Sequence, residues 1–238
     1  NLKPNLPKNL EEISSTIPHP EGITLDDKDN IFVSSASTGN IFLVSKNDIK
    51  VHANTKGRPL GIAYSKKLNS LIAADAARKS VLRISLGNAS ISVLCREYED
   101  MDLNGPSDLI ITENEEIIFT DPIRNPFPNP CISPVYKIPK SNKIETFLTD
   151  LAFPSGIANI DSKVYISETR ANRLVVMEDN QSDEIIEPQM FRRFADPGYP
   201  DGITVDDDKN IYQTLPGIGA IAVINSDGEM TEIYHMES

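Results

Sequence analysis

Two acidic side chains occupy the same place in a repeated phrase of this sequence. Glu21 lies in "HPEGITL" and Asp201 lies in "YPDGITV", each between a proline and a glycine that precede a short alternating segment. A carboxylate is a preferred ligand of hard cations such as Ca²⁺, and it can also act as a general base toward water. Aspartate before glycine is equally a common turn former, so one such residue alone would indicate only a turn.

The phrase occurs five times in the sequence, and this repetition favours a functional interpretation of the two carboxylates over a turn alone. Its other copies are "RPLGIAY", "GPSDLII" and "FPSGIAN", and successive copies lie 39 to 48 residues apart. Leu60 shows that this position does not require a polar residue for folding, so carboxylates at two of the others need a functional reason. The variable position is filled by Glu21, Leu60, Ser107, Ser155 and Asp201.

Each repeat contains four short segments with the alternation and β-branched content typical of strands. The fourth strand of the fourth repeat, for example, is predicted at "FRRFA" (191–195). A period near 45 with four strands per unit indicates an all-β fold, a β-propeller with five complete repeats. We expect one domain over 1–238, and either a five-bladed ring or a six-bladed fold shortened at the C-terminus. The expected repeats are approximately 21–57, 58–104, 105–152, 153–199 and 200–238, with 1–20 as an extra outer strand.

In a propeller, the variable positions of the five phrases would lie close together and could form a site. The innermost strands line a central channel, and the loops that lead into them meet at one mouth. Glu21 and Asp201 are therefore predicted to face one another there. Two carboxylates in a narrow mouth repel each other and are costly to desolvate, and a bound divalent cation removes that cost.

Composition limits the classes of partner. The 238 residues carry 23 Lys and Arg against 35 Asp and Glu, a formal net charge of −12, which argues against nucleic acid and anionic membranes. No apolar run approaches the ~18 residues of a membrane-spanning helix. We expect a soluble protein, cytoplasmic or secreted, that acts on a small molecule. The compartment and the oligomeric state stay open.

Longer stretches resemble a known family. "REYEDMDLNGPSDLIITENEEIIFTDP" (96–122) is similar to the core of the senescence marker protein/gluconolactonase/luciferin-regenerating family. "FPSGIANIDSKVYISETRANRLVVM" and "YPDGITVDDDKNIY" resemble its later blades. The resemblance implies a six-bladed propeller related to lactonases and diisopropyl fluorophosphatases, with one divalent cation, Ca²⁺ or Zn²⁺, at the channel mouth.

The resemblance also implies roles for particular residues. The family's cation ligands are a Glu, two Asn and an Asp, which correspond here to Glu21, Ser107, Ser155 and Asp201. Serine is a shorter and weaker ligand than asparagine, so the two serines depart from the family pattern. Asp201 would act as the catalytic general base or nucleophile, and Asp108 would orient its neighbours. The expected cofactor is Ca²⁺, with Zn²⁺ or Mg²⁺ as substitutes, or none because of the two serines.

Four residues are candidates for substrate binding. His19 and Arg58 flank two of the repeated phrases. Arg124 and Phe127 lie in the proline-rich segment "DPIRNPFPNPCISP" (121–134), which could form a stiff lid.

Three functional interpretations remain open at this point. The first is a metal-dependent hydrolase of lactones or related esters. The second is a metal-independent propeller that binds or transforms an organic ligand, as the similar strictosidine synthase-like propellers do. The third is a non-catalytic interaction module.

Overall fold

The computed structural model describes residues 16–45, 48–126, 129–130, 132–179 and 187–236. These residues form antiparallel strands and two short 3₁₀ turns, η1 (Thr169–Ala171) and η2 (Pro216–Ile218). In this described part, no helix is long and apolar enough to span a membrane. The chain divides into two compact units, called here the first unit (Glu12–Asp150) and the second unit, which contains Leu151–Ser238.

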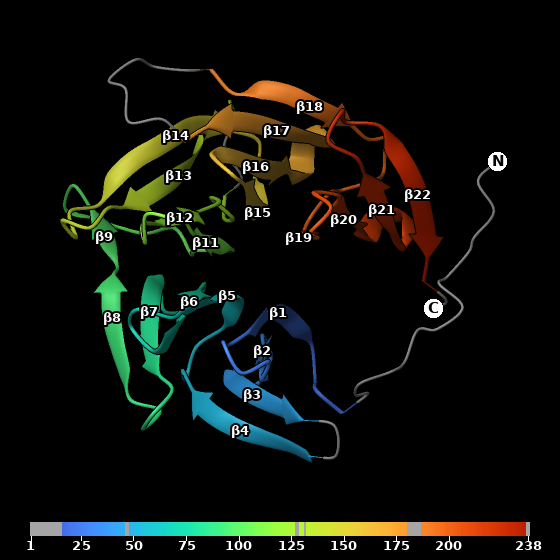
Figure 1. Ribbon diagram of the computed structural model, residues 1–238. Coiled ribbons are helices and arrows are strands. Elements are labelled where there is room, and N and C mark those ends of the chain that lie inside the picture. Colours follow the sequence, from blue (N-terminus) through green and yellow to red (C-terminus); the bar gives the residue numbers. More distant parts are fainter. Residues whose placement is uncertain (1–15, 46–47, 127–128, 131, 180–186, 237–238) are drawn as a thin grey trace. The chain divides into compact units, whose positions relative to one another are not determined.

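The first unit contains three blades, each a four-stranded sheet in which consecutive strands are neighbours (Figure 1). Between the second and third blades the chain makes a small hairpin of two-residue strands, β9 (Glu97–Tyr98) and β10 (Met101–Asp102). The first blade consists of β1 (Pro20–Leu25), β2 (Ile31–Ser35), β3 (Asn40–Ser45) and β4 (Asp48–Asn54). The second consists of β5 (Pro59–Ser65), β6 (Ser70–Asp75), β7 (Ser80–Ser85) and β8 (Ile91–Cys95). The third consists of β11 (Leu109–Ile111), β12 (Ile117–Thr120), β13 (Ser133–Ile138) and β14 (Glu145–Leu151).

The second unit contains two blades with the same strand order. They are β15 (Pro154–Ile160), β16 (Lys163–Glu168), β17 (Arg173–Glu178), β18 (Gln189–Arg193); and β19 (Ile203–Val205), β20 (Ile211–Leu215), β21 (Ala220–Ile224), β22 (Met230–His235).

The cores lie between neighbouring blades, because the alternating side chains of one sheet pack against those of the next. Phe32 and Ile41 of the first blade pack with Leu71 and Leu82 of the second. Other members of the second and third blades form the next core, for example Ile72 with Phe119. In the second unit Tyr165 and Leu174 pack against Ile211 and Ala222.

The predicted fold class is confirmed: the described residues form five complete four-stranded repeats of the β-propeller type. One strand is displaced from its predicted place. "FRRFA" was expected as the fourth strand of its repeat, but β18 spans Gln189–Arg193. Phe191 is the extra residue of a bulge, since Leu174 pairs with Arg192 and Val175 with Met190. Just beyond the end of the strand at Arg193, the Phe194 N–H donates to the Asn172 carbonyl at 2.8 Å. The single-domain assignment and the number of blades in a closed ring stay predictions.

Candidate functional site at the starts of the innermost strands

Consecutive proline phrases contact one another within each unit. In the first unit the Ser34 hydroxyl of β2 links the first two phrases, because it accepts the Gly22 N–H at 2.8 Å and donates to the Leu60 carbonyl, 2.5 Å away. The Gly61 N–H donates to the Ser107 carbonyl, 2.8 Å away. A Cβ on Gly22 would overlap Leu60 O, which explains why this phrase carries glycine. The structure thus brings Glu21, Leu60 and Ser107 into one row of adjoining loops.

The backbone is irregular at these phrases. In three blades the strand pairing shifts between the proline and the residue after the glycine, for example between Pro154 and Ile157. The residue before the proline is left-handed at His19 (φ 44°), Phe153 (φ 60°) and Tyr199 (φ 51°). Such conformations cost about 1 kcal/mol or more each, and bulges re-aim side chains next to functional sites. The irregularity therefore supports a role for these phrases beyond connecting strands.

In the second unit the backbone around Asp201 is held by several polar groups. The Asp201 N–H donates to the Thr214 carbonyl at 3.1 Å, as the equivalent Ser107 N–H does to Thr120 at 2.9 Å. The carbonyl of Pro200 accepts hydrogen bonds from the Thr169 hydroxyl at 2.8 Å and the Ser155 hydroxyl at 3.3 Å. Asp201 itself is exposed. Asp201 is thus a solvent-exposed residue on a backbone that several hydrogen bonds hold in place.

The side chain of Gln213 also holds the backbone around Asp201. Its side chain is fully buried, and its Nε2 lies 3.2 Å from Asp201 O, 3.1 Å from Gly202 O and 3.1 Å from Thr214 O. The Ser167 hydroxyl donates to its Oε1 at 2.7 Å, which fixes the orientation of the amide. Every polar atom of this buried amide has a partner, as burial requires.

Ser155 has a structural partner for its hydroxyl. The residue is 1% exposed, and its Oγ lies 2.7 Å from Thr169 Oγ1 in addition to its bond to Pro200 O. The serine therefore links its own phrase to the phrase that carries Asp201. Its assignment as a metal ligand stays a prediction.

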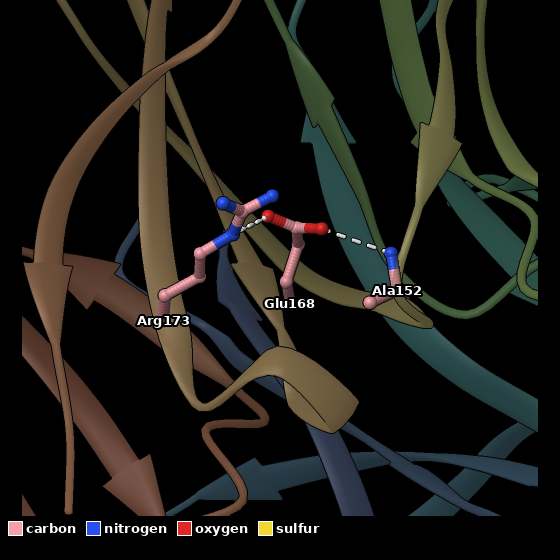
Figure 2. A network of polar contacts seen from close by, with 3 residues as sticks. All are labelled: Ala152, Glu168 and Arg173. Atoms are coloured by element: carbon pink, nitrogen blue, oxygen red, sulfur yellow. Dashed lines mark hydrogen bonds and ion pairs between the residues drawn. The ribbon is translucent and has the colours of Figure 1, made fainter. Parts of the chain in front are cut away.

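Glu168 fixes the loop that precedes Ser155. Figure 2 shows its carboxylate between two donors: one oxygen accepts the Ala152 N–H at 2.9 Å, and the other pairs with Arg173 Nε. The Glu168 side chain is fully buried, whereas that of Arg173 is 34% exposed. Because Ala152 lies three residues before Ser155, this ion pair positions the start of β15.

The second and third blades carry an aspartate at this place, the end of the second strand, whereas the fifth blade carries Leu215. Asp75 Oδ1 accepts the N–H groups of Arg58 and Arg78, and Asp121 accepts those of Asn104 and Gly105. Burial raises the pKa of Asp121 despite these bonds. These carboxylates stabilise the turns and have no exposed surface for chemistry.

The predicted substrate-binding residues are placed as follows. His19 and Arg58 are exposed beside their phrases. The guanidinium of Arg124 folds back onto the third phrase, where Nη1 donates to Gly105 O and Pro122 O. Asp108 Oδ1 accepts the N–H of the next residue, Leu109, at 2.9 Å. Phe127 lies outside the described residues. Substrate contact by these residues stays a prediction.

The two predicted carboxylates belong to different units: Glu21 to the first and Asp201 to the second. Their meeting across a common mouth stays a prediction. Among the described residues, no group of three or more His, Cys, Asp or Glu side chains could hold a metal ion. Any cation site at these phrases would therefore include other oxygen donors, such as serine hydroxyls, carbonyls or water.

Residue-by-residue reading of the sequence missed Gln213 and Thr169. A signal for Gln213 was available in the repeats, because the equivalent positions are Val33, Ala73, Phe119 and Ile166, all apolar. A glutamine at a core position requires polar partners, and here those partners are the backbone carbonyls around Asp201.

The blade repeat and its adjoining proline phrases define the protein as a β-propeller with a candidate site at the starts of its innermost strands. Residues 19–238 match the family described as the SMP-30/Gluconolactonase/LRE-like region, and the chain belongs to this family.

Similar proteins carry related names. The lactonase drp35 of Staphylococcus aureus strain MRSA252 is 26% identical over 87% of this chain and 67% of its own length. A gluconolactonase structure from Xanthomonas campestris superposes with a TM-score of 0.79 at 20% identity, covering 92% of this chain and 76% of that one. Regucalcin of Agrobacterium tumefaciens, described as a calcium-binding protein, gives a TM-score of 0.78 at 16% identity and covers 94% of this chain and 77% of that one. The structural similarities support the fold alone.

Proposed function

We propose that this chain is a hydrolase of lactones or related esters and that Asp201 is its catalytic carboxylate. The observation that carries the proposal is an exposed Asp201 on a backbone held by Gln213, Thr214, Ser155 and Thr169. A catalytic group is effective when surrounding contacts hold it rigidly in place. Family membership and the relative named lactonase support the same reaction class.

In this proposal Asp201 acts as the general base. Its carboxylate takes a proton from water while the oxygen of that water bonds to the lactone carbonyl carbon. The ring C–O bond then breaks, the departing oxygen receives the proton, and the product is a hydroxy acid. In the alternative route Asp201 attacks the carbonyl carbon directly, the ring C–O bond breaks with protonation of the departing oxygen, and water then hydrolyses the resulting anhydride to release the hydroxy acid and restore the Asp201 carboxylate.

A divalent cation, Ca²⁺ or alternatively Zn²⁺ or Mg²⁺, is part of the proposal. The exposed carboxylates of Glu21 and Asp201 and the half-buried hydroxyl of Ser107 are suitable oxygen donors for a hard cation. Ser155 fits less well, because its buried hydroxyl already bonds Thr169 and Pro200. A cation at this site would supply polarisation of the substrate's carbonyl oxygen. Glu21 would hold it, and Ser155 would position the backbone of Asp201.

The test combines cation binding with hydrolysis of a panel of lactones and aryl esters. We expect calorimetry to detect Ca²⁺ binding, chelation to abolish turnover, and Glu21→Gln to weaken cation affinity. Asp201→Asn should lower kcat by at least about a hundredfold, the range expected for loss of a general base. Asp207→Asn, an exposed aspartate of the nearby β19–β20 turn, is the matched control and should leave kcat unchanged.

A second interpretation, a metal-independent propeller acting on an organic ligand, is favoured by one observation: the engaged hydroxyl of Ser155. Turnover that survives chelation and yet depends on Asp201 would select this interpretation. If every compound of the panel is turned over equally by Asp201→Asn and the parent protein, Asp201 is not the catalytic group.

A further inference from the structure

A cavity of about 190 Å³ opens between the second and third blades of the first unit. It lies at the ends of strands β5 and β11, whereas the proline phrases lie at their starts, so it is separate from the candidate site. The β5–β6, β11–β12 and β13–β14 turns surround it together with β8. Its apolar walls are Leu68, Ile72, Leu94, Ile111, Ile117 and Ile138.

The interior of this cavity is aliphatic. Ile72 is fully buried, and Ile117 and Ile138 are 7% and 5% exposed. These three packed side chains form the innermost wall of the cavity. The side chains of Leu94 and Ile111 are partly buried and complete the walls. An apolar ligand of matching size would remove this surface from water.

Charged side chains surround the aliphatic interior. Lys67 of the second blade and Lys140 of the third line the cavity together with Glu115, which gives a formal charge of +1. This is notable in a chain whose net charge is −12. Neither lysine has an ion pair with any residue that the structure describes, so both ammonium groups are available to a ligand.

The nearest buried ion pair does not involve these lysines. Lys137 Nζ lies 2.8 Å from Glu116 Oε2, and both side chains are less than 10% exposed. Lys137 precedes the wall residue Ile138 in β13, and Glu116 directly precedes the wall residue Ile117 at the start of β12, so they point to the opposite face of the sheet. Their charges neutralise one another, which leaves Lys67 and Lys140 as the positive groups of the cavity.

We propose that this cavity binds a monocarboxylate with a short saturated chain. The chain would lie on the aliphatic walls, and the carboxylate would accept hydrogen bonds from Lys67 and Lys140. The volume exceeds that of a ~150 Å³ engineered cavity that holds benzene, so a chain of several carbons fits. A single negative charge neutralises the formal +1 of the rim, whereas a dianion would leave the occupied cavity with a formal charge of −1. This binding is independent of the hydrolase activity proposed above.

Calorimetry with hexanoate, heptanoate and octanoate tests the proposal. Affinity should rise about fourfold with each added methylene, as burial of apolar surface predicts. The double variant Lys67→Met/Lys140→Met keeps the apolar stems, and octanoate should bind to it at least about tenfold more weakly. The same variant should bind 1-octanol as the parent protein does. Leu94→Trp, which fills the cavity from a partly buried position, should abolish binding of both compounds.

Lys66→Met is the matched control, since Lys66 is exposed on the same turn and does not line the cavity. Thermal unfolding of every variant separates loss of binding from loss of folding. The proposal is overturned if octanoate does not bind the parent protein at millimolar concentration, or if affinity is independent of chain length. It is also overturned if Lys66→Met weakens binding as much as the double variant, because the attraction would then be nonspecific.

Discussion

The side-chain amide of Gln213 donates to the backbone carbonyl of Asp201 across 3.2 Å from a fully buried position. The same Nε2 atom reaches the carbonyls of Gly202 and Thr214. One side chain therefore serves three carbonyl groups where β19 and β20 meet, and it fixes the backbone that carries the proposed catalytic carboxylate.

The first prediction concerns this amide. Gln213→Leu preserves most of the volume but removes the amide from the Asp201 carbonyl and from the Ser167 hydroxyl, whereas the Thr214 and Gly202 carbonyls keep their backbone hydrogen bonds. Unsatisfied buried polar groups cost about 1–3 kcal/mol, so we expect the free energy of unfolding to fall by about that amount. In the hydrolase assay the factor by which kcat falls should exceed the factor by which KM rises. The variant displaces the proposed catalytic residue Asp201, whereas the other loops that would bind substrate keep their structure.

Urea unfolding and steady-state kinetics check this prediction. Gln213→Glu is the informative companion, because a carboxylate would face three carbonyl oxygens and be strongly destabilised. Its stability should recover as the pH falls and the introduced carboxyl becomes protonated. A Gln213→Leu protein with unchanged stability and kcat would show that the amide does not position Asp201.

The second prediction compares two glycines of the repeated phrase. A Cβ on Gly156 would overlap Asp201 O and lie 3.0 Å from Ile203 N, whereas the nearest atom to a Cβ on Gly202 is Thr214 Oγ1 at 3.6 Å. Gly156→Ala must push the two phrases apart, so we expect a loss of about 1–3 kcal/mol, as for other overpacked sites. Gly202→Ala should change stability by less than about 0.5 kcal/mol. Equal losses in thermal or urea unfolding would contradict this explanation of the glycine.

These two positions illustrate what the sequence could and could not supply. The repeat "P-x-G" and the alternating strands predicted the five blades, because each blade must bury one face against its neighbour. The reason for the glycine, close approach of the next phrase, requires the packing of two blades and is not visible in one repeat. Gln213 could have been found by comparing repeats, since its equivalents are apolar. Its partners are backbone carbonyls, which no residue pattern specifies.

Other differences between the predicted and the observed structure also have local causes. The β9–β10 hairpin was not predicted because strands of two residues carry no period. The end of β18 was misplaced because alternation cannot reveal a bulge at Phe191. For the site, the sequence located the phrases as a recurring set of loops, and the role of the two carboxylates stays a prediction. It could not show that the Ser155 hydroxyl bonds Thr169 and Pro200, which depends on the meeting of two blades.

The third prediction concerns the buried Glu168. Glu168→Leu removes the acceptor of the Ala152 N–H and leaves Arg173 without its partner. Breaking a buried ion pair costs about 3–5 kcal/mol, and the partial exposure of Arg173 places the expected loss near the lower end. Asp161→Asn is the control: it breaks the Lys209–Asp161 pair, whose side chains are 53% and 70% exposed, and should cost less than about 1 kcal/mol. Chemical unfolding measures both, and similar losses would refute the structural role of Glu168.

The fourth prediction concerns pH and the acidic turn between β19 and β20. Hydrogen bonds, first that from the Asn210 side chain, lower the pKa of Asp206 below its ordinary value of 3.8. The Asn210 Nδ2–Asp206 Oδ2 distance is 2.9 Å. Because the folded protein favours the ionised carboxyl, this stabilisation is fully present above pH 3.8 and is lost as the pH falls through the lowered pKa.

Asn210→Ala removes the largest of these hydrogen bonds, so the pKa of Asp206 should rise toward its ordinary value. The difference in unfolding free energy between pH 7 and pH 3 should become smaller than in the parent protein. Carbon-13 NMR titration of the Asp206 carboxyl measures the pKa directly. Asn30→Ala is the matched control, because Asn30 bonds Asp26 in the corresponding turn of the first blade at 2.7 Å. That variant should leave the titration of Asp206 unaltered, and an unshifted Asp206 in Asn210→Ala would show that the side-chain bond does not control this carboxyl.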